Sequence, residues 1–316
     1  MEKNVLLFWL IPLILVLITL TASFICFMTV FYSSRKPSTE EFPLPVGKQY
    51  EEFYPRMREW MKEFRTLPQT PVEITSFDGL KLRGRYFQHK AGGPIEILFH
   101  GYRGTSYRDL CGAVYRCFTL GRNALVLDHR AAGESEGHVI TFGVREKRDC
   151  LDWIKYTVEH IDPDAKIIIT GISMGAATVL MAASEDLPKN VVGCLSDCGF
   201  SSAEAIIRKT IADMSLPAPI LYPFVRLGAI IFGRFDPNKS SPVTALRSCK
   251  IPVMFIHGDA DYFVPYRMSE ENFAACASEK KKLVLTRDAG HGLCFPKNEE
   301  EYFRENAAFF DPILKK

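Results

Sequence analysis

The sequence lacks the patterns that several common classes of protein require. It has no run of basic residues, and 39 basic against 37 acidic side chains leave a formal charge of only +2, so nothing favours a nucleic-acid partner. A P-loop, a G-x-G-x-x-G fingerprint and an H-E-x-x-H pattern are also absent, which removes the usual signals of nucleotide, dinucleotide and catalytic zinc sites. We therefore expect no cofactor and no metal ion.

Charged side chains are missing from residues 4–34, a stretch of 31 residues. About 20 apolar residues suffice to cross the hydrocarbon core of a bilayer as a helix, whereas the apolar part of a signal peptide has only about 7–15 residues. No A-x-A cleavage site is present, and Phe24-Ile25 before Cys26 is not typical of lipoprotein cleavage. We expect residues 1–34 to form one uncleaved transmembrane anchor, followed by a juxtamembrane segment at 35–71.

The flanks of this anchor favour a cytoplasmic position for the rest of the chain. Lys3 precedes the apolar stretch, while Arg35, Lys36 and Lys48 follow it, and the more basic flank usually stays in the cytoplasm. The nine cysteines are odd in number and form no disulfide framework, which is typical of a reducing compartment. The sequon Asn238-Lys239-Ser240 favours the opposite side, because it matters only in a secretory lumen. The expectation is a single-pass membrane protein whose domain faces the cytoplasm.

A G-x-S-x-G pattern stands at Gly171-Ile172-Ser173-Met174-Gly175. The β-branched run at 166–170 before it is typical of a buried strand, and the small apolar residues at 176–183 after it are typical of a helix packed on a sheet. A serine at such a strand-to-helix turn is a nucleophile elbow. The serine then adopts a strained backbone conformation, and the residues two positions away must be small. The sequence thus predicts that Ser173 is a nucleophile.

A serine hydroxyl becomes nucleophilic when a histidine, itself held by a carboxylate, accepts its proton. Hydrolases with this elbow carry the acid and then the histidine after the serine. Two later strands lead to such residues: the run at 251–256 leads to Asp261, and the run at 282–285 leads to His291. Since the carboxyl ends of parallel strands gather at one edge of a sheet, we expect Ser173, Asp261 and His291 to form a catalytic triad.

Five segments in a fixed order give the chain a family resemblance. They are His100-Gly101-Tyr102-Arg103-Gly104, the run from Asp128 to Gly137, the Ser173 elbow, His257-Gly258-Asp259-Ala260-Asp261, and Gly290-His291-Gly292. With them the chain resembles the α/β-hydrolase superfamily from Val72 to Phe310, especially its membrane-anchored bacterial and eukaryotic serine hydrolases. The resemblance implies that the backbone N–H groups of Tyr102 and Met174 face the oxyanion of the tetrahedral intermediate.

Neighbouring polar residues receive smaller roles from the same resemblance. Asp197, which follows the strand predicted at 191–195, is the alternative acid of the triad. His100 is expected to orient the oxyanion loop through a hydrogen bond, and Asp259 is expected to shape a turn. Cys194 and Cys198 have a C-x3-C spacing, but a metal site needs about four ligands, so we expect buried thiols.

Strands that alternate with helices predict one α/β domain at 72–316. Such a pattern implies a mostly parallel sheet with helices on both faces, which is the fold of the α/β hydrolases. The hairpin at its start turns around Asp78-Gly79. The predicted strands are 72–76, 80–87, 95–99, 124–127, 166–170, 191–195, 253–256 and 282–285, and the predicted helices are 109–120, 145–158 and 299–310.

Two segments outside the sheet are expected to be helical. Residues 50–64 place Phe53, Met57 and Trp60 on one face, which packs either on the membrane surface or, as we favour, on the flank of the domain. Residues 201–250 are expected to form a short apolar cap at the site, with an amphipathic helix at 203–214.

These features together predict a membrane-anchored serine hydrolase of the esterase or lipase type. It would cleave carboxylic esters or thioesters of small acyl or lipid-like substrates through an acyl-enzyme. One alternative is a serine peptidase acting on short peptides, for which the cap offers only Glu204, Asp213 and Asp236 as acidic groups. The other is a non-catalytic, membrane-anchored interaction protein on a hydrolase fold. The sequence does not indicate an oligomeric state.

Overall fold

The chain folds around an eight-stranded sheet in a computed structural model that describes residues 2–34 and 40–315, with side chains from residue 9 onward in these ranges. The strands are β1 (Thr70–Thr75), β2 (Lys81–Phe87), β3 (Ile95–Phe99), β4 (Asn123–Leu127), β5 (Ile167–Ile172), β6 (Val191–Asp197), β7 (Val253–Gly258) and β8 (Lys281–Thr286). Their order is β1-β2-β4-β3-β5-β6-β7-β8. The β1–β2 hairpin and the β2–β4 pair are antiparallel, and every later pair is parallel.

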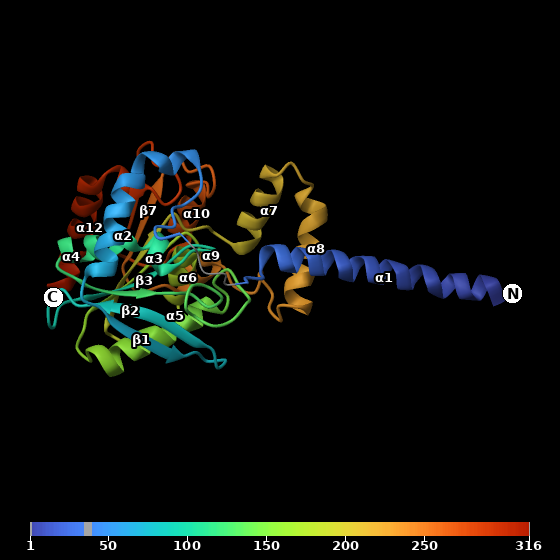
Figure 1. Ribbon diagram of the computed structural model, residues 1–316, viewed down its shortest axis with the longest axis horizontal. Coiled ribbons are helices and arrows are strands. Elements are labelled where there is room, and N and C mark those ends of the chain that lie inside the picture. Colours follow the sequence, from blue (N-terminus) through green and yellow to red (C-terminus); the bar gives the residue numbers. More distant parts are fainter. Residues whose placement is uncertain (1, 35–39, 316) are drawn as a thin grey trace.

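Helices connect these strands and cover the sheet on both sides (Figure 1). The α-helices are α1 (Glu2–Val30), α2 (Tyr54–Thr66), α3 (Ser106–Asp109), α4 (Cys111–Thr119), α5 (Glu146–Tyr156), α6 (Met174–Ala182), α7 (Ala203–Asp213), α8 (Ala218–Ile231), α9 (Pro242–Ala245), α10 (Arg267–Ala275), α11 (Cys294–Lys297) and α12 (Glu299–Leu314). Two 3-10 turns, η1 (Lys48–Phe53) and η3 (Leu246–Ser248), and one π-helical turn, η2 (Thr157–Ile161), complete the described elements.

The central strands are buried on both faces. Ile167 and Ile169 of β5 belong to the apolar cluster that contains Trp153 of α5, whereas Ile168 belongs to the cluster that contains Phe310 of α12. Alternate residues of a strand point to opposite faces, and a parallel sheet covered on both faces needs apolar residues at every position. The predicted mostly parallel sheet with helices on both faces is confirmed.

One carboxylate is buried within this sheet. Glu96 of β3 forms ion pairs with Arg116 of α4 and with Arg122, and it accepts a hydrogen bond of 2.9 Å from Thr170 of β5. Burial by itself raises the pKa of Glu96, but the two guanidinium groups outweigh burial and lower the pKa. The cluster holds β3 beside β5, the two strands that lead to the loop at 100–104 and to Ser173.

Helix α1 projects from the domain, with the N-terminus at its far end (Figure 1). From Trp9 to Ile18 its exposed side chains are large and apolar, and its length and composition suit a membrane span or a signal sequence. Its last turns are built into the domain. Phe31 is fully buried and packs edge-on against Phe142 and Phe235, with ring centroids 5.7 and 5.2 Å apart.

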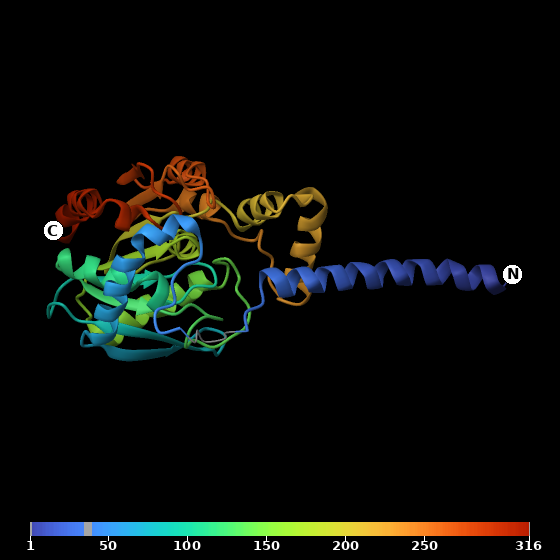
Figure 2. The same ribbon diagram turned by 45° about the horizontal axis from the view of Figure 1, so that its top comes forward.

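Helix α8 crosses α1 where α1 enters the domain, as Figures 1 and 2 both show. Gly228 of α8 lies so close to α1 that a Cβ at this position would collide with the carbonyl oxygen of Ser23. Next to this contact, the ring of Phe232, which follows α8, packs against the rings of Phe24 and Phe27 of α1, with ring centroids 5.1 and 6.0 Å away. The two helices thus form one packed pair.

The described residues between α1 and the sheet pack on the flank of the domain, which is the position that we favour over the membrane surface. The single helix expected at 50–64 is instead the turn η1 followed by α2. Trp60, Met61 and Phe64 of α2 are buried, and a Cβ on Gly112 of α4 would collide with the Trp60 ring.

The helix predicted at 109–120 is also divided, because α3 ends at Asp109 and α4 begins at Cys111. Leu110 between them has φ −116°, outside the helical range. The Asp109 carboxylate accepts a hydrogen bond of 3.2 Å from the N–H of Gly101. This bond ties the end of α3 to the loop after β3, so the break belongs to the architecture of the site.

Candidate active site

The turn between β5 and α6 has the strained conformation that the G-x-S-x-G pattern predicts. Ser173 has φ 56° and ψ −115°, a backbone region that costs a non-glycine residue about 1–3 kcal/mol. A Cβ on Gly171 would collide with the backbone of Gly175, and a Cβ on Gly175 would collide with the carbonyl oxygen of Phe99. Met174 begins α6, so its N–H has no acceptor within the helix.

Ser173, His291 and Asp261 lie together at the carboxyl edge of the sheet. Ser173 Oγ is 2.9 Å from Nε2 of His291, and Nδ1 of His291 is 2.7 Å from Oδ2 of Asp261. An ionised carboxylate can only accept hydrogen bonds, so we assign the ring proton to Nδ1 and let Nε2 accept from the serine hydroxyl. In this arrangement His291 is placed to remove the proton of Ser173.

The Asp261 carboxylate is held on both of its oxygens. Oδ1 accepts hydrogen bonds from the N–H groups of Phe263 at 2.9 Å and Val264 at 2.8 Å. Oδ2 is shared between His291 and a second histidine, His257, whose Nε2 lies 3.2 Å away. These contacts fix the carboxylate before any substrate binds.

His257 was not singled out by the sequence as a site residue. Its Nε2 also lies 2.8 Å from the carbonyl oxygen of Val264, and its Nδ1 lies 2.6 Å from Oγ of Ser269. Because both neighbours of Nε2 are acceptors, Nε2 carries the proton and Nδ1 accepts from Ser269. The sequence feature that could have identified His257 is its position at the start of the segment His257-Gly258-Asp259-Ala260-Asp261, which ends in the acid.

The electrostatics separate Asp261 from the alternative acid, Asp197. Burial by itself raises the pKa of Asp261, but hydrogen bonds from His257 and His291 outweigh burial and lower the pKa to about 2. Burial raises the pKa of Asp197, whose Oδ2 accepts a long hydrogen bond of 3.5 Å from Tyr302. The structure therefore brings Asp261, and not Asp197, into contact with His291.

His100 and Asp259 occupy positions that fit their expected supporting roles. His100 Nδ1 lies 2.7 Å from the carbonyl oxygen of Gly101, and its Nε2 accepts a bond of 3.0 Å from the N–H of His129. Both ring nitrogens of His100 are thus engaged at the base of the oxyanion loop. Asp259 accepts a hydrogen bond of 2.7 Å from the N–H of Asp288, which joins the two loops that carry the acid and the histidine.

The loop that follows β3 is fastened to the end of α1. The hydroxyl of Tyr102 donates to the carbonyl oxygen of Val30 at 2.6 Å, and Nη2 of Arg103 donates to the carbonyl oxygens of Thr29 at 2.7 Å and Tyr32 at 3.1 Å. The last carbonyl groups of a helix have no partner within the helix, so these two side chains complete it. The N–H of Tyr102 therefore sits on a loop whose position depends on α1.

A cavity of about 470 Å³ opens above Ser173 and His291. One wall comes from the juxtamembrane segment, where Gln49 Oε1 touches Gly290 beside the histidine. Burial raises the pKa of Tyr50, and the nearby negative groups add to the effect, so its phenol stays neutral. Many of the wall residues are apolar or aromatic, among them Pro45, Val46, Tyr50, Met57, Trp60, Phe263, Phe295 and Pro296, while Gln49 and the charged residues Arg108, Asp109, Arg116 and Asp197 also line the cavity.

The segment 201–250 does not line this cavity within the described part of the chain, and its role as a cap at the site stays a prediction. Helices α7 and α8 extend away from the sheet and toward α1 (Figure 1). The reason is that the apolar side of α8 finds a matching apolar surface on α1. The acidic groups of the segment are all paired, as Glu204–Arg208, Asp213–Lys209 and Asp236–Arg226.

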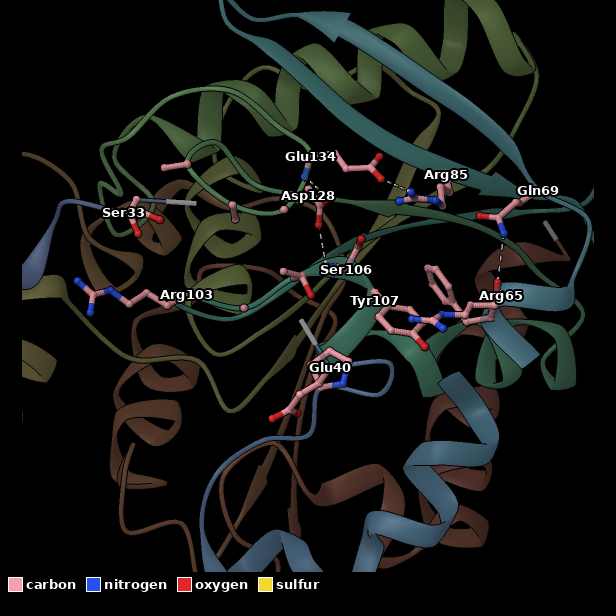
Figure 3. Close-up of a pocket in the computed structure, with 18 of the residues that line it drawn as sticks. Ser33, Glu40, Arg65, Gln69, Arg85, Arg103, Ser106, Tyr107, Asp128 and Glu134 are labelled. Atoms are coloured by element: carbon pink, nitrogen blue, oxygen red, sulfur yellow. Dashed lines mark hydrogen bonds and ion pairs between the residues drawn. The ribbon is translucent and has the colours of Figure 1, made fainter. Parts of the chain in front are cut away.

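A second cavity, of about 760 Å³, lies beside the end of α1 (Figure 3). Its charged side chains are engaged with neighbours: Arg85 pairs with Glu134 at 2.6 Å, and Asp128 accepts from the N–H of Ser106 at 2.8 Å. Among the described residues that line it, none is a histidine or a cysteine. It therefore offers no histidine or thiol beside its serines, and we assign it no catalytic role.

Cys198 lies close to the triad, because its Sγ and one ligand atom each of Asp261 and His291 are within 4.8 Å of one another. Metal ions bind the thiolate. Burial raises the pKa of the Cys198 thiol well above its usual value, and the charge of Asp197 adds to this. The donor set does not suit a metal ion, and we interpret Cys198, like Cys194, as a buried free thiol.

Comparison with known proteins places this geometry in a family. Residues 141–316, more than half of the chain, match the model of the prolyl oligopeptidase family. The chain belongs to this family of α/β hydrolases. Ser173, Asp261 and His291 of the hydrolase lie inside the matched region, whereas Tyr102 and the cavity wall at 45–60 lie before it.

Individual proteins extend the similarity. The hydrolase is 25% identical over 255 residues to YqkD of Bacillus subtilis (strain 168), which covers 79% of this chain and 82% of YqkD. It is 30% identical over 176 residues to the thiohydrolase aneE of Aspergillus aculeatus, which covers 49% of this chain and 54% of aneE. The esterase Pf2001 of Pyrococcus furiosus shares the fold with a TM-score of 0.67 at 22% identity, over 88% of this chain and 100% of the esterase.

Proposed function

We propose that this hydrolase is a membrane-anchored serine hydrolase that cleaves carboxylic esters or thioesters of acyl or lipid-like substrates. The observation that carries the proposal is the hydrogen-bonded series from Ser173 Oγ through His291 to Asp261, at 2.9 and 2.7 Å. It stands on a strained elbow and opens into a cavity with apolar walls.

In the first half of the proposed reaction, Ser173 Oγ attacks the acyl carbon while its proton passes to Nε2 of His291. The carboxylate of Asp261 stabilises the imidazolium that forms. The carbonyl electrons move to the oxygen, which accepts hydrogen bonds from the N–H groups of Tyr102 and Met174.

In the second half, the intermediate collapses. The alcohol or thiol leaves with the proton from His291, and the acyl group stays on Ser173. A water molecule then attacks the acyl-enzyme while His291 removes a proton from that water. Release of the carboxylic acid returns that proton to Ser173.

Three observations support an ester or thioester as the substrate. The walls at Met57, Trp60 and Phe295 suit an acyl chain. Phe263 packs edge-on against the ring of His291, with centroids 5.0 Å apart, which puts an apolar surface at the reacting group. One similar protein is named a thiohydrolase and one structural neighbour an esterase.

Two observations support an uncleaved anchor with a cytoplasmic domain. Phe27 of α1 and Phe31, which directly follows α1, are buried in the domain, so cleavage after the apolar stretch would remove part of the core. The Asn238 amide of the sequon donates to Glu204 at 2.6 Å and accepts from Tyr222, and a glycan would break this bond. The basic residues 35 and 36 lie outside the described residues.

The name of the matched family favours a peptidase as the second candidate. Such an enzyme would need an acidic group to bind the free amine of a short peptide. The three acids of the segment 201–250 are paired with basic side chains and do not line the cavity in the described chain. Asp109 and Asp197 do line it, but Asp109 forms an ion pair with Arg108, and burial raises the pKa of Asp197. A non-catalytic interaction protein would not need the Ser173–His291 bond at all.

The proposal is tested by labelling membranes with a fluorophosphonate probe. Wild type and the control Ser248→Ala, an exposed serine, should be labelled in the membrane fraction, and Ser173→Ala should not. The purified chain is then given p-nitrophenyl esters from acetate to dodecanoate and an alanine p-nitroanilide. Preference for longer esters supports the proposal, acetate alone contradicts the acyl substrate, and the anilide alone supports a peptidase. A folded wild type without labelling would favour the interaction protein.

A further inference from the structure

The outer face of α8 is unusually apolar for an exposed helix. Arg226 is the only charged residue between Leu216 and Gly233. Its guanidinium makes two hydrogen bonds with the carboxylate of Asp236, of 3.0 and 2.7 Å, so even this charge is compensated. The exposed large apolar side chains of the region, here called the α8 face, are Leu216, Ile220, Ile230, Ile231 and Phe232.

The α8 face continues the exposed apolar surface of α1. Figures 1 and 2 show α8 crosswise to α1, at the side of the domain from which α1 projects. The contact between Gly228 and Ser23 fixes the crossing point. Toward the N-terminus, α1 exposes apolar side chains from Ile18 back to Trp9.

The crossing point lies at the depth where a bilayer would end. A hydrocarbon core of about 30 Å needs about 20 residues of helix at 1.5 Å each. Counted from Asn4, where the uncharged stretch begins, this length ends at Ser23. A helix that crosses α1 at Ser23 therefore lies at the membrane–water boundary, parallel to its plane.

We propose that α8 is an interfacial helix, whose exposed face lies in the boundary layer of the bilayer that α1 spans. The inference rests on the proposed function only through the membrane span. A helix that lies in the interface presents an apolar face to the acyl chains, and the α8 face has this character. A lipid surface would cover the α8 face and the neighbouring part of α1 together, whereas a second copy would have to match both at once.

The test uses the full chain in liposomes of phosphatidylcholine and phosphatidylglycerol. A fluorescent NBD label is attached to new cysteines in four variants: Ile220→Cys and Ile231→Cys on the α8 face, Ile14→Cys in the span, and Glu300→Cys on α12 as the exposed control. Eight native cysteines are buried and Cys26 is half-buried, so wild type gives the background. Nitroxide lipids with the quencher at a shallow or a deep acyl position report depth.

We expect the labels at 220 and 231 to be quenched more strongly by shallow than by deep nitroxides. The label at 14 should be quenched by the deep ones, and the label at 300 by neither. Fluorophosphonate labelling of each variant confirms that its active site is intact. Two α8 positions guard against a local effect of one label.

Three outcomes would overturn the inference. Absence of quenching at 220 and 231, with quenching at 14, would remove α8 from the membrane and leave the anchor standing. Absence of quenching at 14 as well would remove the span and the inference together. Blue-shifted emission at 220 and 231 without quenching would mean that a second copy of the chain covers the α8 face.

Discussion

The two segments that stand outside the sheet face different surroundings. Residues 45–60 close one wall of the cavity above Ser173, while α8 packs on α1 and α7 packs on α8. The comparison shows that neither nearness to α1 in the sequence nor apolar character alone decides whether a segment lies beside Ser173. The residues that follow α1 line the cavity above Ser173, and the apolar helix α8 packs on α1.

The physical reason lies in the side chains of each segment. Trp60 fills a gap left by Gly112, which holds the juxtamembrane segment on α4 and next to the site. Helix α8 instead offers Gly228 and Phe232 to α1, a close helix contact of small and aromatic groups. Each segment therefore docks where its own shape is matched.

The largest effect should come from the catalytic side of the comparison. His291→Gln removes the base that faces Ser173 and should lower kcat for p-nitrophenyl butyrate by at least about 10³-fold. His257→Gln removes only a brace on Asp261 and should cost about tenfold. Steady-state kinetics of the two variants checks this. A loss in His257→Gln as large as that in His291→Gln would contradict the supporting role given to His257.

A change on the membrane side should separate stability from activity. Gly228→Val places side-chain atoms against the carbonyl oxygen of Ser23 and should lower the free energy of unfolding by about 1–3 kcal/mol. Hydrolysis of a soluble ester should stay within about twofold of wild type, because a site away from the cavity leaves the transition-state contacts unchanged. Chemical denaturation in detergent, with Ile230→Val as control, measures the first quantity. If Gly228→Val lowered the rate of ester hydrolysis as well as the free energy of unfolding, the expected separation of stability from activity would be contradicted.

The pH dependence of stability gives a smaller effect on the catalytic side. The pKa of Asp261 is lowered to about 2 from its ordinary value of 3.8, so its carboxylate stabilises the folded chain above about pH 4, and this stabilisation is lost as pH falls toward 2. At neutral pH it contributes about 2 kcal/mol. Unfolding of wild type and Asp261→Asn between neutral pH and the lowest pH at which both fold checks this. A difference that does not shrink in acid would contradict the assignment.

Arg103 links the two regions, because it ties the oxyanion loop to the end of α1. Arg103→Ala should release the loop and lower kcat about tenfold with little change in KM. Arg103→Lys keeps a donor and should recover part of the loss. Arg226→Ala, which removes a charge from α8 only, is the matched control. A rise in KM with kcat unchanged would mean that Arg103 contacts the substrate instead.

The sequence was sufficient to predict that Ser173, Asp261 and His291 lie together, because the motifs that carry them are local. Ser173, Asp261 and His291 each follow a recognisable strand, and the edge of a parallel sheet gathers them. His257 belongs to the same motif as Asp261. Its contact with the carboxylate, however, depends on the path of the following loop, which brings the carbonyl oxygen of Val264 to Nε2 of His257.

The positions of the outer segments depend on contacts that no local pattern encodes. Trp60 docks on Gly112 from a distant part of the chain, and Ser23 meets Gly228 in the same way. The break at Leu110 follows from the bond between Asp109 and the oxyanion loop, which is visible only once the fold is formed. The place of the segment 201–250 could not be predicted for this reason.

We propose that residues 45–60, rather than the segment 201–250, select the substrate. This proposal is tested most directly by the ratio of kcat/KM for p-nitrophenyl octanoate to that for the acetate. Met57→Phe narrows the cavity wall and should lower this ratio about fivefold, whereas Ile220→Phe on α8 should leave it unchanged. A ratio that responds to Ile220→Phe and not to Met57→Phe would contradict the account.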